Sequence, residues 1–112
     1  MEKIEAVDAL MALAHETRLD IFRALVRAGR SGMAAGAVAE ALELPASTLS
    51  FHFKELKFAG VVTCRREGRS LIYNANFAAM SELVGFLTEN CCEADGLTDC
   101  APATGTDACT GT

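Results

Sequence analysis

Two short helical patterns lie in the middle of this chain, separated by only a few residues. Apolar residues at helical spacing predict one helix over Met33–Leu42. Pro45 prevents this helix from continuing. A second pattern predicts a helix over Thr48–Phe58, with Ser47 as its N-cap and Gly60 at its end. Two short helices joined by so tight a turn are typical of a helix-turn-helix motif.

Further helical patterns flank this pair. One helix is predicted from Ile4 to Leu13, and another from Glu16 to Gly29, with Leu19 in its buried stripe. Asn76 is the expected N-cap of a last helix whose apolar stripe runs from Phe77 to Cys91. The chain is therefore expected to be mostly α-helical.

The pattern changes between Gly60 and Asn76. Val61–Cys64 and Leu71–Tyr73 are rich in strand-forming residues, and a turn over Glu67–Ser70 separates them. This predicts a two-stranded β-hairpin, the wing of a winged helix-turn-helix. Three arginines lie near its tip: Arg65, Arg66 and Arg69.

Positive charge is concentrated where these motifs lie. The chain carries a net charge of −5, yet residues 45–70 have five basic and two acidic residues, and residues 80–112 have six acidic and no basic residues. The second helix of the pair is expected to expose hydroxyl, aromatic, imidazole and ammonium groups at Ser47, Thr48, Ser50, Phe51, His52 and Lys54. The arginines of the hairpin would bind flanking phosphates or the minor groove. Together these features predict binding to double-stranded operator DNA.

Each feature has a plainer interpretation when it is taken alone. Ser47 could be only a helix cap, His52 a partly buried ring and the arginines a solvated surface. A capped amphipathic helix, a hairpin and a local positive charge in an acidic chain favour DNA binding when they occur together.

Two stretches, Ala12–Ile21 and Leu44–Leu56, together with the hairpin segment Gly68–Tyr73, resemble the ArsR/SmtB family of bacterial metal-responsive repressors. The resemblance covers about residues 4–92. It implies a winged-helix homodimer whose first and last helices form the interface. It also implies that the helix containing Ser47 to Lys54 enters the major groove, and that an effector lowers the affinity for the operator.

The family's usual effector sites are missing from this chain. Many members have two cysteines in the helix before the recognition helix, where this sequence has Ala34 and Gly36. The family's zinc site on the last helix needs a histidine, and no histidine follows His52. The sensor is therefore expected elsewhere.

A cluster of cysteines near the C-terminus is the alternative candidate. Thiolates suit thiophilic ions, so Cys91, Cys92 and Cys100 are predicted to bind trivalent arsenic or antimony as the effector. Adjacent residues of a helix diverge by about 100°. The last helical turn must therefore open for Cys91 and Cys92 to converge on one ion, while Gly96 lets Cys100 fold back.

Other interpretations of these cysteines stay open. With Cys109, a four-thiolate site for zinc or cadmium is possible, although the spacing is unusual. A thiol redox switch, or cysteines with no role, are further alternatives. Cys64 is expected in the core rather than at a metal.

An enzyme is not expected. A small thiol oxidoreductase that acts on arsenate would need an activated cysteine in a phosphate-binding or Cys-x-x-Cys setting, and neither pattern occurs. We expect a DNA-binding and dimerisation domain over residues 1–92 and a tail over residues 93–112 that does not fold alone. No membrane span is predicted, and a cytoplasmic location is expected.

Overall fold

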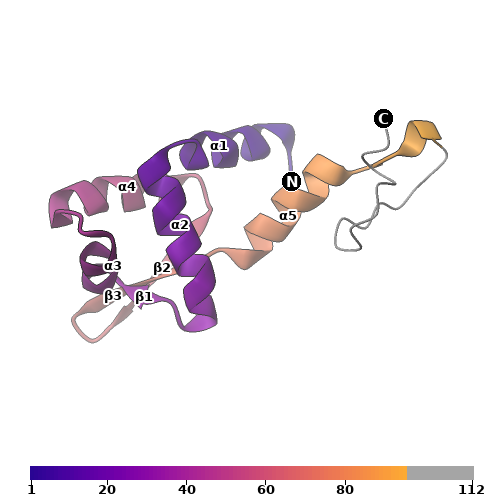
Figure 1. Ribbon diagram of the computed structural model, residues 1–112. Coiled ribbons are helices and arrows are strands. Elements are labelled where there is room, and N and C mark those ends of the chain that lie inside the picture. The colour runs from indigo at the N-terminus through magenta and orange to yellow at the C-terminus, as the bar shows by residue number, and fades with distance from the viewer. Residues whose placement is uncertain (96–112) are drawn as a thin grey trace.

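A computed structural model describes residues 1–95 of the chain. Five α-helices and three strands make up its main elements (Figure 1). In chain order these are α1 (Lys3–Leu13), α2 (Glu16–Ala28), β1 (Met33–Ala34), α3 (Ala35–Leu42), α4 (Ala46–Phe58), β2 (Val62–Glu67), β3 (Ser70–Ala75) and α5 (Phe77–Thr88), with short 3-10 turns at Gly29–Ser31 and Glu93–Asp95. The mostly helical winged helix-turn-helix predicted from the sequence is confirmed.

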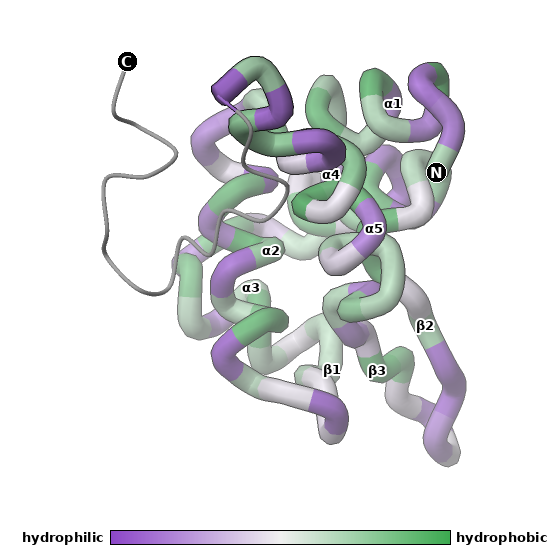
Figure 2. The backbone as a smooth tube through the Cα atoms, turned by 90° about the vertical axis from the view of Figure 1, so that its right-hand side faces the viewer, coloured by the Kyte–Doolittle hydropathy of each residue, from purple (hydrophilic) through white to green (hydrophobic). Residues whose placement is uncertain are grey.

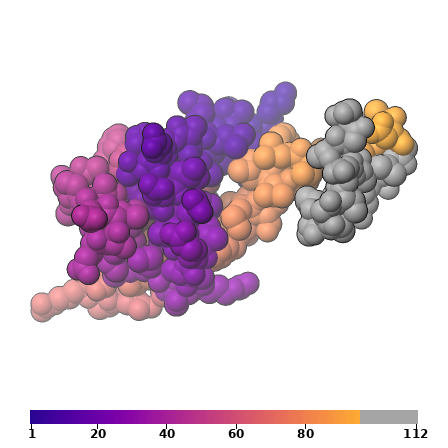
Figure 3. Space-filling view, viewed as in Figure 1, coloured from indigo at the N-terminus to yellow at the C-terminus, as the bar shows by residue number. Residues whose placement is uncertain are grey.

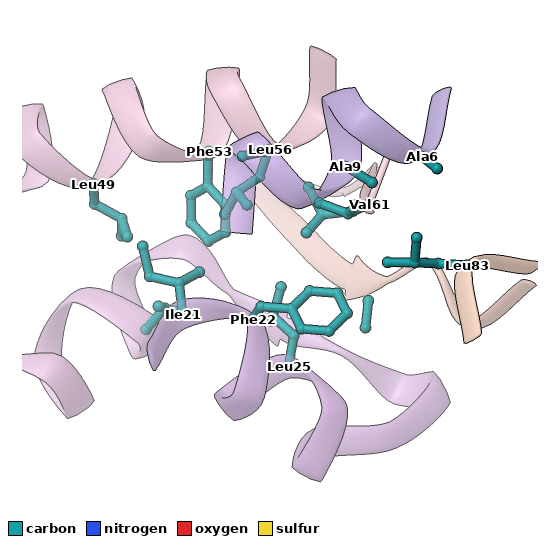
Figure 4. Close-up of a cluster of buried hydrophobic side chains, with 14 residues drawn as sticks. Ala6, Ala9, Ile21, Phe22, Leu25, Leu49, Phe53, Leu56, Val61 and Leu83 are labelled. Atoms are coloured by element: carbon teal, nitrogen blue, oxygen red, sulfur yellow. The ribbon is translucent and has the colours of Figure 1, made fainter. Parts of the chain in front are cut away.

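One apolar core joins α1, α2, α3, α4 and the base of the sheet (Figure 4). Ile21 and Leu25 of α2 and Leu56 of α4 have no exposed surface. The fully buried residues of α1 are all small, Ala6, Ala9 and Ala12, so this helix can approach the others closely. Burial of this apolar surface is the main source of stability of the fold.

The two helices of the helix-turn-helix begin at different residues from those predicted. Met33 is in strand β1, not in the first of these helices, because its backbone pairs with that of Tyr73 in β3. The α4 helix begins at Ala46 with Pro45 as its N-cap, so the prediction that Ser47 is the cap is wrong. Proline has no N–H and a fixed φ, which suits it to the start of a helix.

The sheet has three antiparallel strands in the order β1-β3-β2, not the two that were predicted. The short β1 strand adds to the predicted hairpin, in which Glu67 pairs with Ser70 next to the turn. Tyr73 lies on the central strand, opposite Met33 on one side and Cys64 on the other. Its ring stacks on that of Phe53 in α4, with 3.7 Å between centroids and an interplanar angle of 5°. The wing is thereby packed directly against α4.

The α5 helix projects from the rest of the molecule beside the start of α1 (Figures 1 and 3). It ends at Thr88, three residues before the predicted end at Cys91. Asn76 is its N-cap as predicted, and its side chain accepts a hydrogen bond from the N–H of Ala79.

Apolar side chains remain exposed on α1 and α5, and both helices carry hydrophobic stretches in Figure 2. Ile4 and Met11 of α1 are 70% and 69% exposed, and Val84 and Leu87 of α5 are 53% and 59% exposed. Leu19 of α2 is also exposed rather than in the predicted buried stripe. These residues lie outside the core of a single chain. Among the described residues, no helix is both long enough and apolar enough to cross a membrane.

Two glycines provide a test of the tight junction between α2 and the sheet. Gly32 has φ of +72°, and a Cβ atom there would lie 2.5 Å from the carbonyl oxygen of Tyr73. Gly36, in the first turn of α3, has no atom near the corresponding position. We predict that Gly32→Ala lowers the free energy of unfolding by about 2 kcal/mol or more, because left-handed backbone strain adds to the steric overlap.

Gly36→Ala is the matched control. It should be neutral, or stabilising by up to about 1 kcal/mol, because alanine favours the helix. Urea unfolding followed by circular dichroism measures both variants. Equal effects of the two substitutions would contradict this account of Gly32.

Candidate nucleic-acid interface

The turn between α3 and α4 places α4 with one face in the core and the other in solvent. Glu43, which follows α3, adopts a left-handed conformation with φ of 54°. On α4, Leu49, Phe53 and Leu56 are buried. The opposite side exposes Ser47, Thr48, Ser50, Phe51 and Lys54, which we call the outer face of α4. These five predicted site residues therefore share one accessible surface.

His52 does not belong to this surface. It is only 7% exposed, so the expectation that its imidazole is free to contact bases is wrong. On a helix, residues three or four positions apart share a face, and His52 falls on the face of Leu49, Phe53 and Leu56. The alternative interpretation, a buried ring, is the one that the structure supports.

His52 is held by the start of α2. The Nε of Arg18 donates a hydrogen bond of 3.1 Å to Nδ1 of His52. The ring of His15, the N-cap of α2, lies 4.9 Å from the His52 ring. The guanidinium of Arg18 also lies 5.6 Å from the centre of the Phe51 ring. No local sequence pattern marks Arg18 as a site residue, because only the tertiary contact between α2 and α4 brings it to this surface.

The environment of His52 favours its neutral form. Burial lowers the pKa of His52, and electrostatic interaction with the neighbouring Arg18 and His15 side chains lowers it further. A neutral ring with an unprotonated Nδ1 is also what the hydrogen bond from Arg18 requires. The contact between α2 and α4 therefore depends on an uncharged His52.

This contact predicts a pH dependence of stability. Below about pH 6.5, the usual histidine pKa, the unfolded chain binds a proton at His52 before the folded chain does. The free energy of unfolding should therefore fall as the pH is lowered from 7.5 to 5.5. In His52→Gln, whose amide oxygen can accept the bond from Arg18 without titrating, this part of the fall should disappear.

His15→Gln is the control for this prediction, and urea unfolding at both pH values is the measurement. Most of the pH dependence should persist in the control, because burial of His52 is the largest cause of its lowered pKa. An unchanged pH dependence in His52→Gln would contradict the prediction.

The three arginines of the hairpin have different environments. Arg65 donates hydrogen bonds to Glu67 (2.8 Å), to the side-chain oxygen of Asn74 (2.7 Å) and to the carbonyl oxygen of Ser31 (3.0 Å). Asn74 in turn donates to the carbonyl oxygen of Arg30. Arg65 and Asn74 thus tie the hairpin to the turn after α2. Asn74 was not predicted as a site residue, and no local pattern marks it.

Arg66 and Arg69 are different. Both are exposed, and within residues 1–95 neither makes a hydrogen bond or an ion pair. Their positive charges are therefore available for an external anion. The hairpin projects at the end of the molecule where α4 begins, opposite to α5 (Figures 1 and 3). One end of the protein thus presents the outer face of α4 and two unpaired arginines.

The predicted thiol site is described only in part. Cys91 and Cys92 lie in the turn after α5, and their Sγ atoms are 3.4 Å apart. Cys92 has a left-handed backbone with φ of 63°, so the chain has left the helix at this point, as convergence of the two sulfurs requires. Cys100 and Cys109 lie outside the described residues. Within residues 1–95, no group of three or more potential ligand side chains is arranged to hold a metal ion.

Cys64 lies on β2, as predicted, and is half-buried. Burial raises the pKa of Tyr73, and a hydrogen bond with the Cys64 thiol adds to this shift. Cys64 thus contacts Tyr73 within the sheet, as a structural side chain does.

Known proteins share this arrangement. A family model described as a helix-turn-helix domain matches residues 13–65, which include α2, α3 and α4. Nodulation protein NolR of Rhizobium meliloti is 32% identical over 84 residues. The match covers 75% of this chain and 66% of NolR, slightly less than two thirds of that relative.

Solved structures are similar over most of the chain. An ArsR-like transcriptional regulator from Rhodococcus sp. RHA1 has a TM-score of 0.71 and 27% identity, with coverage of 82% of this chain and 84% of that one. HlyU from Vibrio cholerae N16961 has a TM-score of 0.62 and 35% identity, with coverage of 78% of this chain and 97% of that one. The chain belongs to the ArsR-like family of winged helix-turn-helix transcriptional regulators.

Proposed function

We propose that this protein is a homodimeric repressor that binds operator DNA through α4 and the hairpin, and that a thiophilic ion releases it. The observation that carries the DNA-binding part is the joint exposure of the outer face of α4 and the unpaired arginines Arg66 and Arg69 at one end of the molecule. Hydroxyl and ammonium groups on a helix can contact base edges in the major groove, while arginines on a wing neutralise phosphates.

The exposed apolar residues of α1 and α5 support the dimer. Ile4 and Met11 on α1, and Val84 and Leu87 on α5, are large side chains that a single chain leaves in water. Packing against a second copy would bury them. Two α4 helices would then read two half-sites about 34 Å apart, one turn of the DNA helix.

The two unpaired arginines give the test of DNA binding. The wild-type protein should select a duplex from a random pool, and its affinity should fall steeply with salt. Arg66→Ala and Arg69→Ala should each weaken binding to all duplexes and reduce the slope of log K against log salt by about one, because each removes one phosphate contact. Fluorescence anisotropy at several salt concentrations measures this slope.

Two further arginines serve as controls. Arg23→Ala, on the exposed side of α2, should leave the slope unchanged. Arg65→Ala, unlike Arg66→Ala and Arg69→Ala, should lower the free energy of unfolding, because it removes three hydrogen bonds within the protein. Absence of any preference among duplexes, or a monomer in sedimentation at micromolar concentration, would contradict the proposal.

The effector that we propose is trivalent arsenic or antimony, bound by Cys91, Cys92 and Cys100. Sulfurs 3.4 Å apart are close enough to bind one ion together, since metal–sulfur bonds of about 2.3 Å permit sulfur–sulfur distances up to about 4.6 Å. Thiolates are the preferred ligands of such soft ions. Cys91 and Cys92 lie just after α5, which we place in the dimer interface. An ion bound there would change the packing at the end of this helix.

Serine variants test this effector site. Arsenite or antimonite should weaken operator binding of the reduced wild-type protein by about 5- to 150-fold, the usual range of allosteric coupling. Cys91→Ser, Cys92→Ser and Cys100→Ser should each keep DNA binding and lose the response, because a hydroxyl is a poor ligand for a soft ion. Cys109→Ser is the matched control and should respond almost normally.

Titrations with zinc, cadmium and a thiol oxidant distinguish the alternatives. A response to zinc or cadmium that also needs Cys109 would replace the three-thiolate site by a four-thiolate one. Release by the oxidant alone would indicate a redox switch. If none of the four cysteines matters, the sensor is not at this end of the chain.

A further inference from the structure

Phe51 is unusual on the outer face of α4. Its ring is 56% exposed, whereas the other members of this face, Ser47, Thr48, Ser50 and Lys54, are polar. It lies in the middle of the helix, one turn after the first residues that would enter a groove. A large apolar side chain at the centre of this polar surface can contact an apolar group of a ligand.

Two neighbouring side chains lie against the ring. The Arg18 guanidinium lies 5.6 Å from the ring centre. The His52 ring also meets Phe51, at a centroid distance of 5.6 Å and an interplanar angle of 62°. A cation beside an aromatic ring and an edge-to-face ring pair are both attractive arrangements.

Arg18 is itself fixed. Its Nε bonds to His52, which is buried and is packed against His15. The contacts run from the start of α2 through Arg18 to both Phe51 and His52, so the exposed ring is supported by the protein interior. Such support reduces the loss of side-chain entropy when the ring binds.

The major groove offers few apolar partners. The donors and acceptors of the four bases are polar, and the C5-methyl group of thymine is the apolar group on their major-groove edges. We propose that Phe51 recognises the methyl group of a thymine, and that Arg18 is the positioning residue that holds the Phe51 ring for this contact. The inference rests on the proposed DNA binding, because Phe51 meets a base only if α4 enters the major groove.

Replacement of thymine by deoxyuracil tests the proposal, because it removes the methyl group and keeps base pairing. Each thymine of the selected duplex is replaced in turn. The wild-type protein should lose affinity about four-fold at one thymine of each half-site, the effect of burying one methyl-sized group at about 0.8 kcal/mol. At other positions the replacement should have little effect.

Protein variants test whether the loss of affinity for uracil duplexes depends on Phe51 and Arg18. Phe51→Ala and Arg18→Ala should bind the thymine and uracil duplexes equally. Lys54→Ala, on the same face, should weaken binding to both and retain the four-fold ratio. Arg18→Ala should leave the salt slope unchanged, whereas a decrease of about one would show that Arg18 contacts a phosphate directly and would overturn its positioning role.

The outcomes separate this inference from the function on which it rests. A wild-type protein that selects no duplex contradicts the proposed DNA binding. A protein that selects an operator but is insensitive to every thymine methyl refutes the role of Phe51 alone. If Arg18→Ala does not fold by circular dichroism, Arg18→Lys replaces it. Lysine retains the charge but lacks the planar group that holds the ring, so the four-fold ratio should again be lost.

Discussion

The position of α4 relative to the hairpin depends on the stacking of Phe53 on Tyr73. Phe53 lies on the inner face of α4, and Tyr73 lies on the central strand of the sheet. This ring pair therefore joins the helix directly to the sheet. Because the same α4 helix turns its outer face to solvent, packing of the core determines where Ser50, Phe51 and Lys54 are presented.

Two arginines near the surface also fix the relative positions of these elements. Arg18 joins α2 to α4 through His52 and Phe51, and Arg65 joins the hairpin to the turn after α2. Both carry charge close to the proposed DNA interface, yet their hydrogen bonds are used within the protein. Arg66 and Arg69 have no such partners among the described residues and keep their charge for an external anion. Structural and binding roles are thus divided among residues of the same type.

The opposite end of the molecule has a different chemistry. There α1 and α5 expose large apolar residues, and Cys91 and Cys92 lie in the turn after α5. If this end forms the dimer interface, a change at Cys91 and Cys92 acts on the packing of two subunits and thereby on the separation of their α4 helices. Such coupling needs no contact between the effector and DNA, only a different affinity of the effector for the two arrangements.

Local sequence patterns were enough to predict the helix-turn-helix, the hairpin and the final helix, because helical periodicity, strand-forming residues, Pro45, Gly60 and Asn76 act over a few neighbouring residues. Tertiary packing was needed to form the third strand, since Met33 pairs with Tyr73 forty residues away. It likewise decided that His52 is buried and that Arg65 is paired, because their partners Arg18, Ser31 and Asn74 come from other elements. A local pattern shows which side chains a helix or hairpin carries, whereas the packing of distant segments determines which of them remain accessible.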